Sequence, residues 1–347
     1  MVLQKFNQFF TFCLFLIVLS TGCSTTDEDA NYKTEQGYAL GTTYSIKYEV
    51  KNDSVNLKKQ IEAVFDSVNA SMSTYLPTSD ISAINRGDST IVVDKYFREV
   101  YTTAKEIWRK TNGFFDPTIG ALANAWGFGP EMAINDMKSE EVDSLLEFTG
   151  FDKVFMSSDN RVIKEKKNIY LDFNALAKGY TIDLIGRMFD RNGVENYLIE
   201  VGGEILTRGN SKNTSKVKNW VVAIDSPIQD NEQRVLIAKV KLEDKAMATS
   251  GNYRKFRIDK KTGEHYVHII NPLTGYPQKS NVLSVSVVAK TCMVADAYAT
   301  ALMVMPLDKA KELLKSTPSI DAYIISADKD GDLVEYKTSG FQELLLD

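Results

Sequence analysis

The spacing of apolar residues along the chain predicts both helices and strands. Apolar side chains recur at three- and four-residue intervals, the mark of a helix with one buried face, over residues 57–71, 97–111, 176–191 and 293–305. Alternating or short apolar runs predict strands over residues 38–50, 197–201, 220–225, 235–242 and 282–288, with a hairpin over 321–336. Because helices and strands do not alternate in a regular βαβ order, we predict an α+β fold rather than a doubly wound parallel sheet.

The N-terminal segment has the features of an export signal. Lys5 supplies a positive start, and residues 9–19 form an apolar run that only Thr11 interrupts. This run is too short for a membrane-spanning helix, which needs about 20 residues, but it suits the core of a signal peptide. We therefore expect residues 1–22 to be removed from the mature protein.

Cys23 follows Gly22 directly, an arrangement that resembles the lipobox of bacterial lipoproteins, in which the cysteine becomes the lipidated N-terminus. Ser20 departs from the leucine that is commonest three positions before that cysteine. An ordinary signal peptide with a chance cysteine is the alternative. On the lipoprotein interpretation, residues 23–36 are a lipidated polar tether and residues 37–347 a folded domain. The protein would then be lipid-anchored in the cell envelope, outside the cytoplasm, at the periplasmic face of the inner or outer membrane.

Composition narrows the chemistry that the chain can perform. Of its 347 residues, 44% are hydrophobic and 25% charged, which are globular proportions. The formal charge of −5 gives no electrostatic reason to expect nucleic acid as a partner. Three cysteines and two histidines cannot supply a disulfide framework or a zinc site of the usual kind. Carboxylates, hydroxyls, amides and backbone groups must therefore carry most of the chemistry.

Two segments place polar residues where a strand or turn is expected to meet a helix. Asp116 stands at a probable turn within the glycine-rich residues 112–130, where a functional carboxylate and a structural Asx-type turn are both open. Over residues 171–183, a strand is expected to run into a helix, which brings Asp172, the Ala175 carbonyl and Lys178 to the helix N-terminus. Such an end attracts phosphate, although a capped helix with a solvated lysine is the commoner meaning of this pattern.

Three further patterns have possible functional meanings. Residues 200–204 place two glycines between carboxylates, where backbone could approach a ligand closely. Residues 268–277 set a histidine among turns, although a lone histidine is usually structural. Asp296 and Thr300 lie four apart on an expected helix and so share one face, where they could supply part of a Mg²⁺ shell, although this spacing is common by chance.

Taken in order, these segments resemble the ApbE family of FAD:protein FMN transferases. The resemblance covers about residues 37 to 304 and rests on eight motifs: residues 40–42, 72–75, 113–118, 172–180, 200–204, 249–251, 268–277 and 295–300. Any one motif is loose, but eight in register behind a lipobox are specific.

The resemblance implies an α+β fold of mixed or antiparallel sheets and packed helices around an FAD cleft, with Mg²⁺ at the pyrophosphate. The FAD contacts implied are Leu40, Tyr75, Phe114, Phe115, Asp116, Asp172, Lys178 and Ile270. The metal contacts implied are the Ala175 carbonyl, Asp296 and Thr300. Leu40 stands where the family usually has methionine, and Ala299 where some relatives have a carboxylate, so the metal would carry one more water.

The resemblance also implies the reaction and its partners. A threonine hydroxyl of an acceptor protein would attack the phosphorus on the FMN side of FAD, with AMP as the leaving group and His268 as the candidate base. The acceptor would be a subunit of a membrane electron-transport complex. The alternatives are an FAD pyrophosphatase, which uses water in place of threonine, a flavin-binding lipoprotein without catalysis, and an interaction lipoprotein without a ligand.

We expect Cys23 to be the lipidated first residue of the mature protein, because the apolar run of the signal peptide ends just before it. Mass spectrometry of protein extracted from the cell envelope should find a diacyl or triacyl modification on Cys23. An unmodified N-terminus at any other residue would contradict the lipoprotein interpretation.

Overall fold

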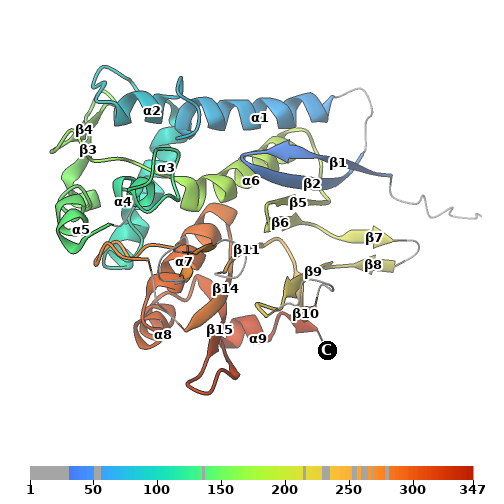
Figure 1. The fold of residues 1–347 in the computed structure, drawn as a ribbon. Coiled ribbons are helices and arrows are strands. Elements are labelled where there is room, and N and C mark those ends of the chain that lie inside the picture. The colour runs from blue at the N-terminus through green and yellow to red at the C-terminus, as the bar shows by residue number, and fades with distance from the viewer. Residues whose placement is uncertain are drawn as a thin grey trace, which may run out of the picture.

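A computed structural model describes residues 31–50, 56–134, 137–213, 216–228, 235–251, 256–258, 265–267, 269–277 and 281–346 (Figure 1). The expected signal peptide, Cys23 and His268 lie outside the described residues. Within the described ranges, each helix is too short or too polar to cross a membrane.

The centre of the fold is an eight-stranded sheet in which every neighbouring pair of strands is antiparallel. In order across the sheet its strands are β1 (Tyr32–Ala39), β2 (Thr42–Glu49), β5 (Tyr197–Val201), β6 (Glu204–Arg208), β11 (Ala246–Gly251), β14 (Val282–Ala289), β15 (Ile320–Ala327) and β16 (Leu333–Lys337). Because β2 pairs with β5, two hairpins far apart in sequence become neighbours.

Helices cover one face of this sheet. They are α1 (Leu57–Met72), α2 (Asp80–Asn85), α3 (Lys95–Lys110), α4 (Gly120–Ala125), α5 (Ser139–Leu146), α6 (Asn174–Arg191), α7 (Cys292–Val304) and α8 (Leu307–Ser316), with a 3₁₀ turn at Phe151–Lys153. Apolar residues of α6 pack on β2 and β5, and apolar residues of α3, α7 and α8 pack on β11, β14 and β15. The helical layer therefore buries the core and carries α6 and α7 across the middle of the sheet.

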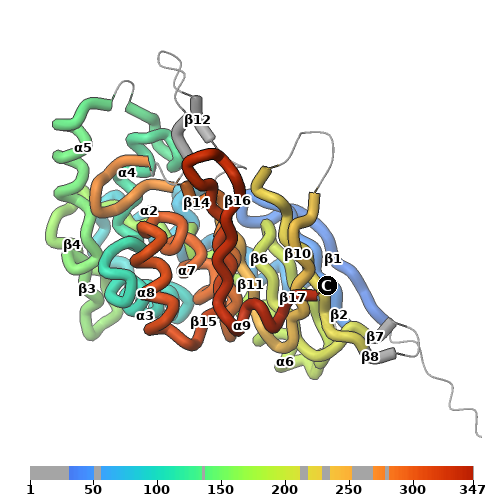
Figure 2. The backbone as a smooth tube through the Cα atoms, turned by 90° about the horizontal axis from the view of Figure 1, so that it is seen from below, coloured from blue at the N-terminus to red at the C-terminus, as the bar shows by residue number. Residues whose placement is uncertain are grey.

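A smaller sheet covers part of the opposite face, where β17 (Leu345–Leu346), β10 (Leu236–Leu242) and β9 (Trp220–Asp225) pack with α9 (Ser339–Gln342). Figure 2 shows the central strands between α7 and α8 on one side and β10, β17 and α9 on the other. Three small hairpins complete the description: β3 (Val154–Met156) with β4 (Val162–Lys164), β7 (Ser211–Asn213) with β8 (Lys216–Lys218), and β12 (Phe256–Ile258) with β13 (His265–Val267).

The α+β class expected from the sequence is confirmed, and the four helices with strong apolar periodicity lie within two residues of their expected bounds. The single strand expected over residues 38–50 is wrong, because the chain reverses at Leu40 and Gly41. Both residues have positive φ, +52° and +73°, as a tight hairpin turn requires. Leucine rarely adopts this conformation, so nothing but Gly41 signalled the turn. Strand β1 also begins at Tyr32, inside the range expected to be tether.

Helices α6 and α7 approach each other closely at Gly179. A Cβ atom there would lie 2.4 Å from the carbonyl oxygen of Cys292, so only glycine fits. One turn further along α6, the buried carboxylate of Asp183 accepts the backbone N–H groups of Cys292 (2.8 Å) and Met293 (2.9 Å). These are N-terminal N–H groups of α7 that its own helix leaves unpaired. The N-terminus of α7 is thus fixed against the middle of α6.

Candidate functional site

The N-terminus of α6 lies at the centre of the polar residues that the sequence singled out. Asp172 precedes the helix, and its Oδ1 accepts the backbone N–H of Asn174 at 2.7 Å. The backbone N–H of Asp172 donates to the carbonyl of Pro117 at 2.8 Å, which fixes the 113–118 segment against the helix start. Burial raises the pKa of Asp172, while hydrogen bonds from Asn174 and the charge of Lys178 oppose the rise.

Lys178 lies between two buried carboxylates on different elements. Its Nζ is 3.2 Å from Oε1 of Glu204, the first residue of β6, and 3.6 Å from Oδ2 of Asp296 on α7. Burial by itself lowers the pKa of Lys178, but the two carboxylates outweigh burial and raise it, so the ammonium stays charged. The alternative interpretation, a capped helix whose lysine is simply solvated, is therefore wrong for Lys178.

The carboxylate of Asp296 also contacts the backbone of α6. The N–H of Gly179 donates to Oδ2 of Asp296 at 3.2 Å. In a regular helix that N–H faces the carbonyl four residues earlier, which is Ala175. Asp296 therefore lies against the same turn of α6 that holds the Ala175 carbonyl.

Thr300 follows Asp296 by four residues on α7 and is partly exposed, so it extends the same face of the helix. Among the described residues, no group of three His, Cys, Asp or Glu side chains forms a metal site. A cation here would therefore depend on neutral oxygens in addition to Asp296. A carboxylate, a backbone carbonyl and a hydroxyl are hard oxygen donors of the kind that Mg²⁺ takes while retaining waters.

Two hairpin turns lie side by side next to this cluster. The Leu40–Gly41 turn joins β1 to β2, and the Gly202–Gly203 turn joins β5 to β6. The backbone N–H of Gly202 donates to the carbonyl of Thr43 at 3.0 Å, and a Cβ on Gly202 would lie 2.8 Å from the Thr42 side chain. Leu40 is partly buried against the α6 side of the sheet. The hairpin turn that carries Leu40 therefore lies beside the turn that leads into Glu204.

Tyr75 lies in the loop after α1, and 62% of its surface is exposed. The neighbouring Thr74 hydroxyl accepts the side-chain N–H of Asn174 at 3.4 Å, so this loop lies against the start of α6. Partial burial and the charge of Asp172 both raise the pKa of Tyr75. Tyr75 is thus no core residue: it offers an open aromatic ring near Asp172.

Asp116 and the aromatic residues before it are buried. Phe114 and Phe115 belong to the main core. Asp116 Oδ1 accepts the N–H (2.8 Å) and the hydroxyl (2.5 Å) of Thr118 in an Asx turn, while Oδ2 accepts the indole N–H of Trp108 (3.0 Å) and the N–H of Phe151 (3.1 Å). Both oxygens of the Asp116 carboxylate are therefore used to hold the surrounding loops together. A ligand beside this segment could bind to its backbone N–H and carbonyl groups.

Ile270 lies in a separate buried cluster with Leu122 and Val142. Its segment, residues 269–277, is held by Trp126, whose indole N–H donates to the carbonyl of Gly275 at 2.8 Å.

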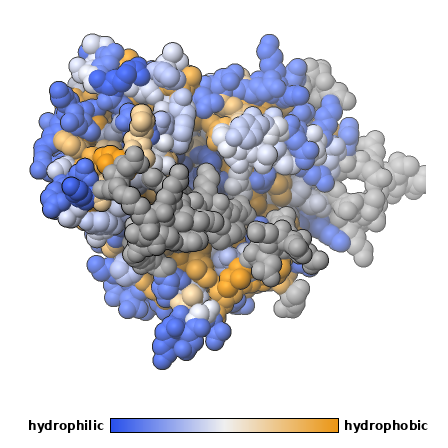
Figure 3. All heavy atoms as spheres, viewed as in Figure 1, coloured by the Kyte–Doolittle hydropathy of each residue, from blue (hydrophilic) through white to orange (hydrophobic). Residues whose placement is uncertain are grey.

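Figure 3 shows the molecular face seen in Figure 1, on which hydrophobic side chains appear among the hydrophilic ones.

The residue that sequence reasoning under-used is Glu204. The sequence pattern places it at one end of a glycine-containing turn and predicts no role for it. No local pattern in the sequence identifies its role, which follows from the observed register: Glu204 pairs with the buried Val201, so both face α6.

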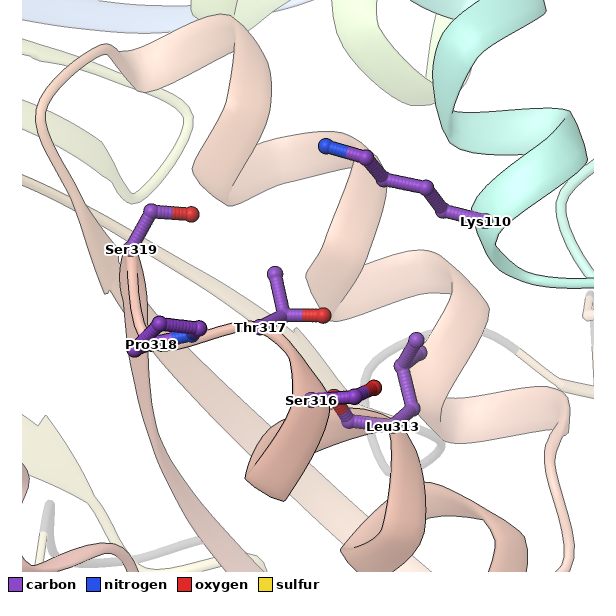
Figure 4. A pocket seen from close by; sticks show the side chains of 6 residues that line it. All are labelled: Lys110, Leu313, Ser316, Thr317, Pro318 and Ser319. Atoms are coloured by element: carbon purple, nitrogen blue, oxygen red, sulfur yellow. The ribbon is translucent and has the colours of Figure 1, made fainter.

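A hollow of about 240 Å³ lies elsewhere, between the C-terminal ends of α3 and α8 (Figure 4). Lys110 borders it from α3, opposite Thr317, and the ammonium is paired with Glu106 at 2.6 Å. None of the expected site residues lines this hollow.

The chain is similar to known proteins over most of its length. Residues 40–324 match the model of the ApbE family. The chain is 33% identical to an FAD:protein FMN transferase of Vibrio cholerae, over 95% of this chain and 96% of the relative. It is 30% identical to an FAD:protein FMN transferase of Haemophilus influenzae, over 94% and 96%. The solved structure of the flavin transferase ApbE from Vibrio cholerae matches with a TM-score of 0.81 at 34% identity, over 91% of this chain and 100% of that one.

We expect Asp116→Ala to lower the free energy of unfolding by about 4 kcal/mol, because it leaves several buried donors without an acceptor. Urea denaturation measures the change. Asp159→Ala is the matched control, since Asp159 is also hydrogen-bonded to a residue two positions away but is exposed, and it should cost less than about 1 kcal/mol. Equal, small losses in both variants would show that the Asp116 carboxylate does not hold the surrounding loops together.

Proposed function

The chain belongs to the ApbE family, and on that premise we propose that it is a Mg²⁺-dependent FAD:protein FMN transferase. It would move FMN from FAD to a threonine hydroxyl of an acceptor protein and release AMP. The observation that carries the proposal is the convergence of Lys178 and Asp296 at the start of α6. This arrangement combines a fixed ammonium, a helix N-terminus and a hard anionic oxygen, which are the groups that a pyrophosphate and its cation need.

The residues fit a bound Mg²⁺ by their donor chemistry. The Ala175 carbonyl, Asp296 and Thr300 would hold it, with water and phosphate oxygens as further ligands. When bound, the cation would neutralise pyrophosphate charge, including the charge that develops on the leaving AMP.

The chain's own residues would bind and orient FAD. Lys178 and the N-terminal N–H groups of α6 would attract the phosphates. Tyr75 would cover the flavin or its ribityl chain with its open ring, and Leu40 would contact the same ligand from the adjacent hairpin turn. Asp172, which lies between Tyr75 and Lys178, would accept a hydrogen bond from a ligand hydroxyl or imide N–H.

The chemical step is a phosphoryl transfer, in which positioning and charge neutralisation contribute most. The threonine oxygen would attack the phosphorus on the FMN side, forming a P–O bond as the bond to the bridging oxygen breaks. AMP would leave with that oxygen, and the threonine proton would pass to a base. His268 is the candidate base and lies outside the described residues.

The proposal extends to location and partner. Cys23 would anchor the protein by lipid in the cell envelope, outside the cytoplasm, and the acceptor would be a threonine-bearing subunit of a membrane electron-transport complex. The lipobox-like sequence that ends at Cys23 supports the location. The acceptor is proposed from the family to which the chain belongs.

We expect Tyr75→Ala to weaken FAD binding by about one to two orders of magnitude, since aromatic stacking contributes roughly 1–3 kcal/mol. Quenching of flavin fluorescence on titration measures the affinity. Tyr75→Phe, which keeps the ring, should bind nearly as well as the wild-type protein. Unchanged affinity in Tyr75→Ala would remove Tyr75 from the flavin site.

Asp296→Ala should abolish FMN transfer at ordinary Mg²⁺ concentrations, because the pyrophosphate charge would lose its compensation. AMP release and fluorescent labelling of a threonine-containing acceptor measure the reaction, and circular dichroism checks that the fold is intact. Lys178→Ala should have a milder effect. Transfer by Asp296→Ala at the wild-type rate would overturn the metal assignment.

A further inference from the structure

Glu204 has one carboxylate oxygen that the fold leaves unused. Oε1 lies 3.2 Å from Nζ of Lys178, whereas Oε2 is buried and has no hydrogen-bond partner among the described residues. The residue as a whole is 6% exposed. A buried carboxylate oxygen that accepts no hydrogen bond lowers the stability of the folded protein. The presence of Glu204 at this position therefore needs an explanation other than stability.

The position of Glu204 directs its charge at the proposed phosphate site. Glu204 pairs with Val201 across the hairpin, and both face α6. Oε2 would lie 3.3 Å from a Cβ on Gly202, and the same Cβ would lie 2.8 Å from the side chain of Thr42, the residue that follows the Leu40–Gly41 turn. The free oxygen is thus enclosed between Lys178 and the turn that is proposed to contact the ligand.

The charges around Lys178 do not balance. One partly exposed ammonium faces two buried carboxylates, Glu204 and Asp296, and burial together with the charge of Glu204 raises the pKa of Asp296 to about 7. Such an excess negative charge is weakly screened. A pyrophosphate, which brings two further negative charges, would meet repulsion here unless a cation came with it.

We propose that Glu204 is a positioning residue that makes FAD binding conditional on a divalent cation. This inference rests on the proposed function. Without the cation, Glu204 and Asp296 together outweigh Lys178 and disfavour the pyrophosphate. A divalent cation at Asp296 would keep that carboxylate ionised and would shift the local balance toward positive charge. Glu204 then remains the carboxylate partner that keeps Lys178 in place.

The proposal is a coupling between two ligands, so it can be measured by binding alone. FAD is titrated by fluorescence into wild-type protein and Glu204→Gln, once with a chelator and once with Mg²⁺. Glutamine keeps the volume and an oxygen that can accept from Lys178, but it removes the charge. We expect the metal-free affinity of Glu204→Gln for FAD to rise about tenfold, and the enhancement by Mg²⁺ to fall about tenfold relative to wild type.

Two variants control for structure and for general charge. Glu204→Asp keeps the charge and should keep the metal dependence of the wild-type protein. Glu200→Gln removes a charge from the other side of the sheet, since Glu200 pairs with Ile205. Oε1 of Glu200 accepts the N–H of Gly203 at 2.7 Å, and the glutamine oxygen can keep this hydrogen bond, so the variant should leave the enhancement unchanged. Thermal melting verifies that each variant is folded.

The outcomes separate this inference from the proposed function. If Glu204→Gln shows the wild-type enhancement by Mg²⁺, or binds FAD more weakly without metal, the coupling role of Glu204 is wrong while FAD binding stands. If the wild-type protein binds FAD equally well with and without Mg²⁺, the same conclusion follows. If it binds no FAD under either condition, the proposed function fails as well.

Discussion

The candidate site depends on the close crossing of α6 and α7. Gly179 allows the two backbones to approach, and Asp183 fixes the first N–H groups of α7. This contact sets the separation between Lys178 on one helix and Asp296 on the other. A side chain at position 179 would separate the helices and with them the ammonium from the carboxylate, whatever the rest of the fold did. The packing of α6 on α7 and the spacing of the charged groups in the candidate site therefore both depend on Gly179.

The sequence predicted those parts of the fold that follow from local periodicity. Helices such as α1 and α3 have a strong apolar stripe, and their bounds could be predicted closely. The reversal at Leu40 could not, because its left-handed backbone is required by the two-residue turn that pairs β1 with β2, and leucine rarely adopts it. The sequence pattern reports side-chain preference, and Leu40 goes against that preference.

The candidate site shows the same division. Asp172 and Lys178 could be placed at a helix N-terminus from their spacing alone, and the structure places them there. The contact between Lys178 and Glu204 joins residues of α6 and β6. It could not be read from spacing, since it depends on which face of the sheet α6 covers. Asp116 shows the opposite risk: its turn was evident, but only the packed structure reveals that Trp108 and Phe151 use the remaining oxygen.

Leu40 shows that this fold keeps a locally unfavourable conformation beside the site. A leucine at φ +52° costs on the order of 1 kcal/mol relative to the extended region. Glycine or asparagine would relieve that strain at once. A selection for thermal stability alone would therefore replace this side chain early, and a library sorted by melting temperature would enrich such variants. If Leu40 contacts the ligand as we propose, a screen for stability and a screen for ligand binding would select different residues at this position.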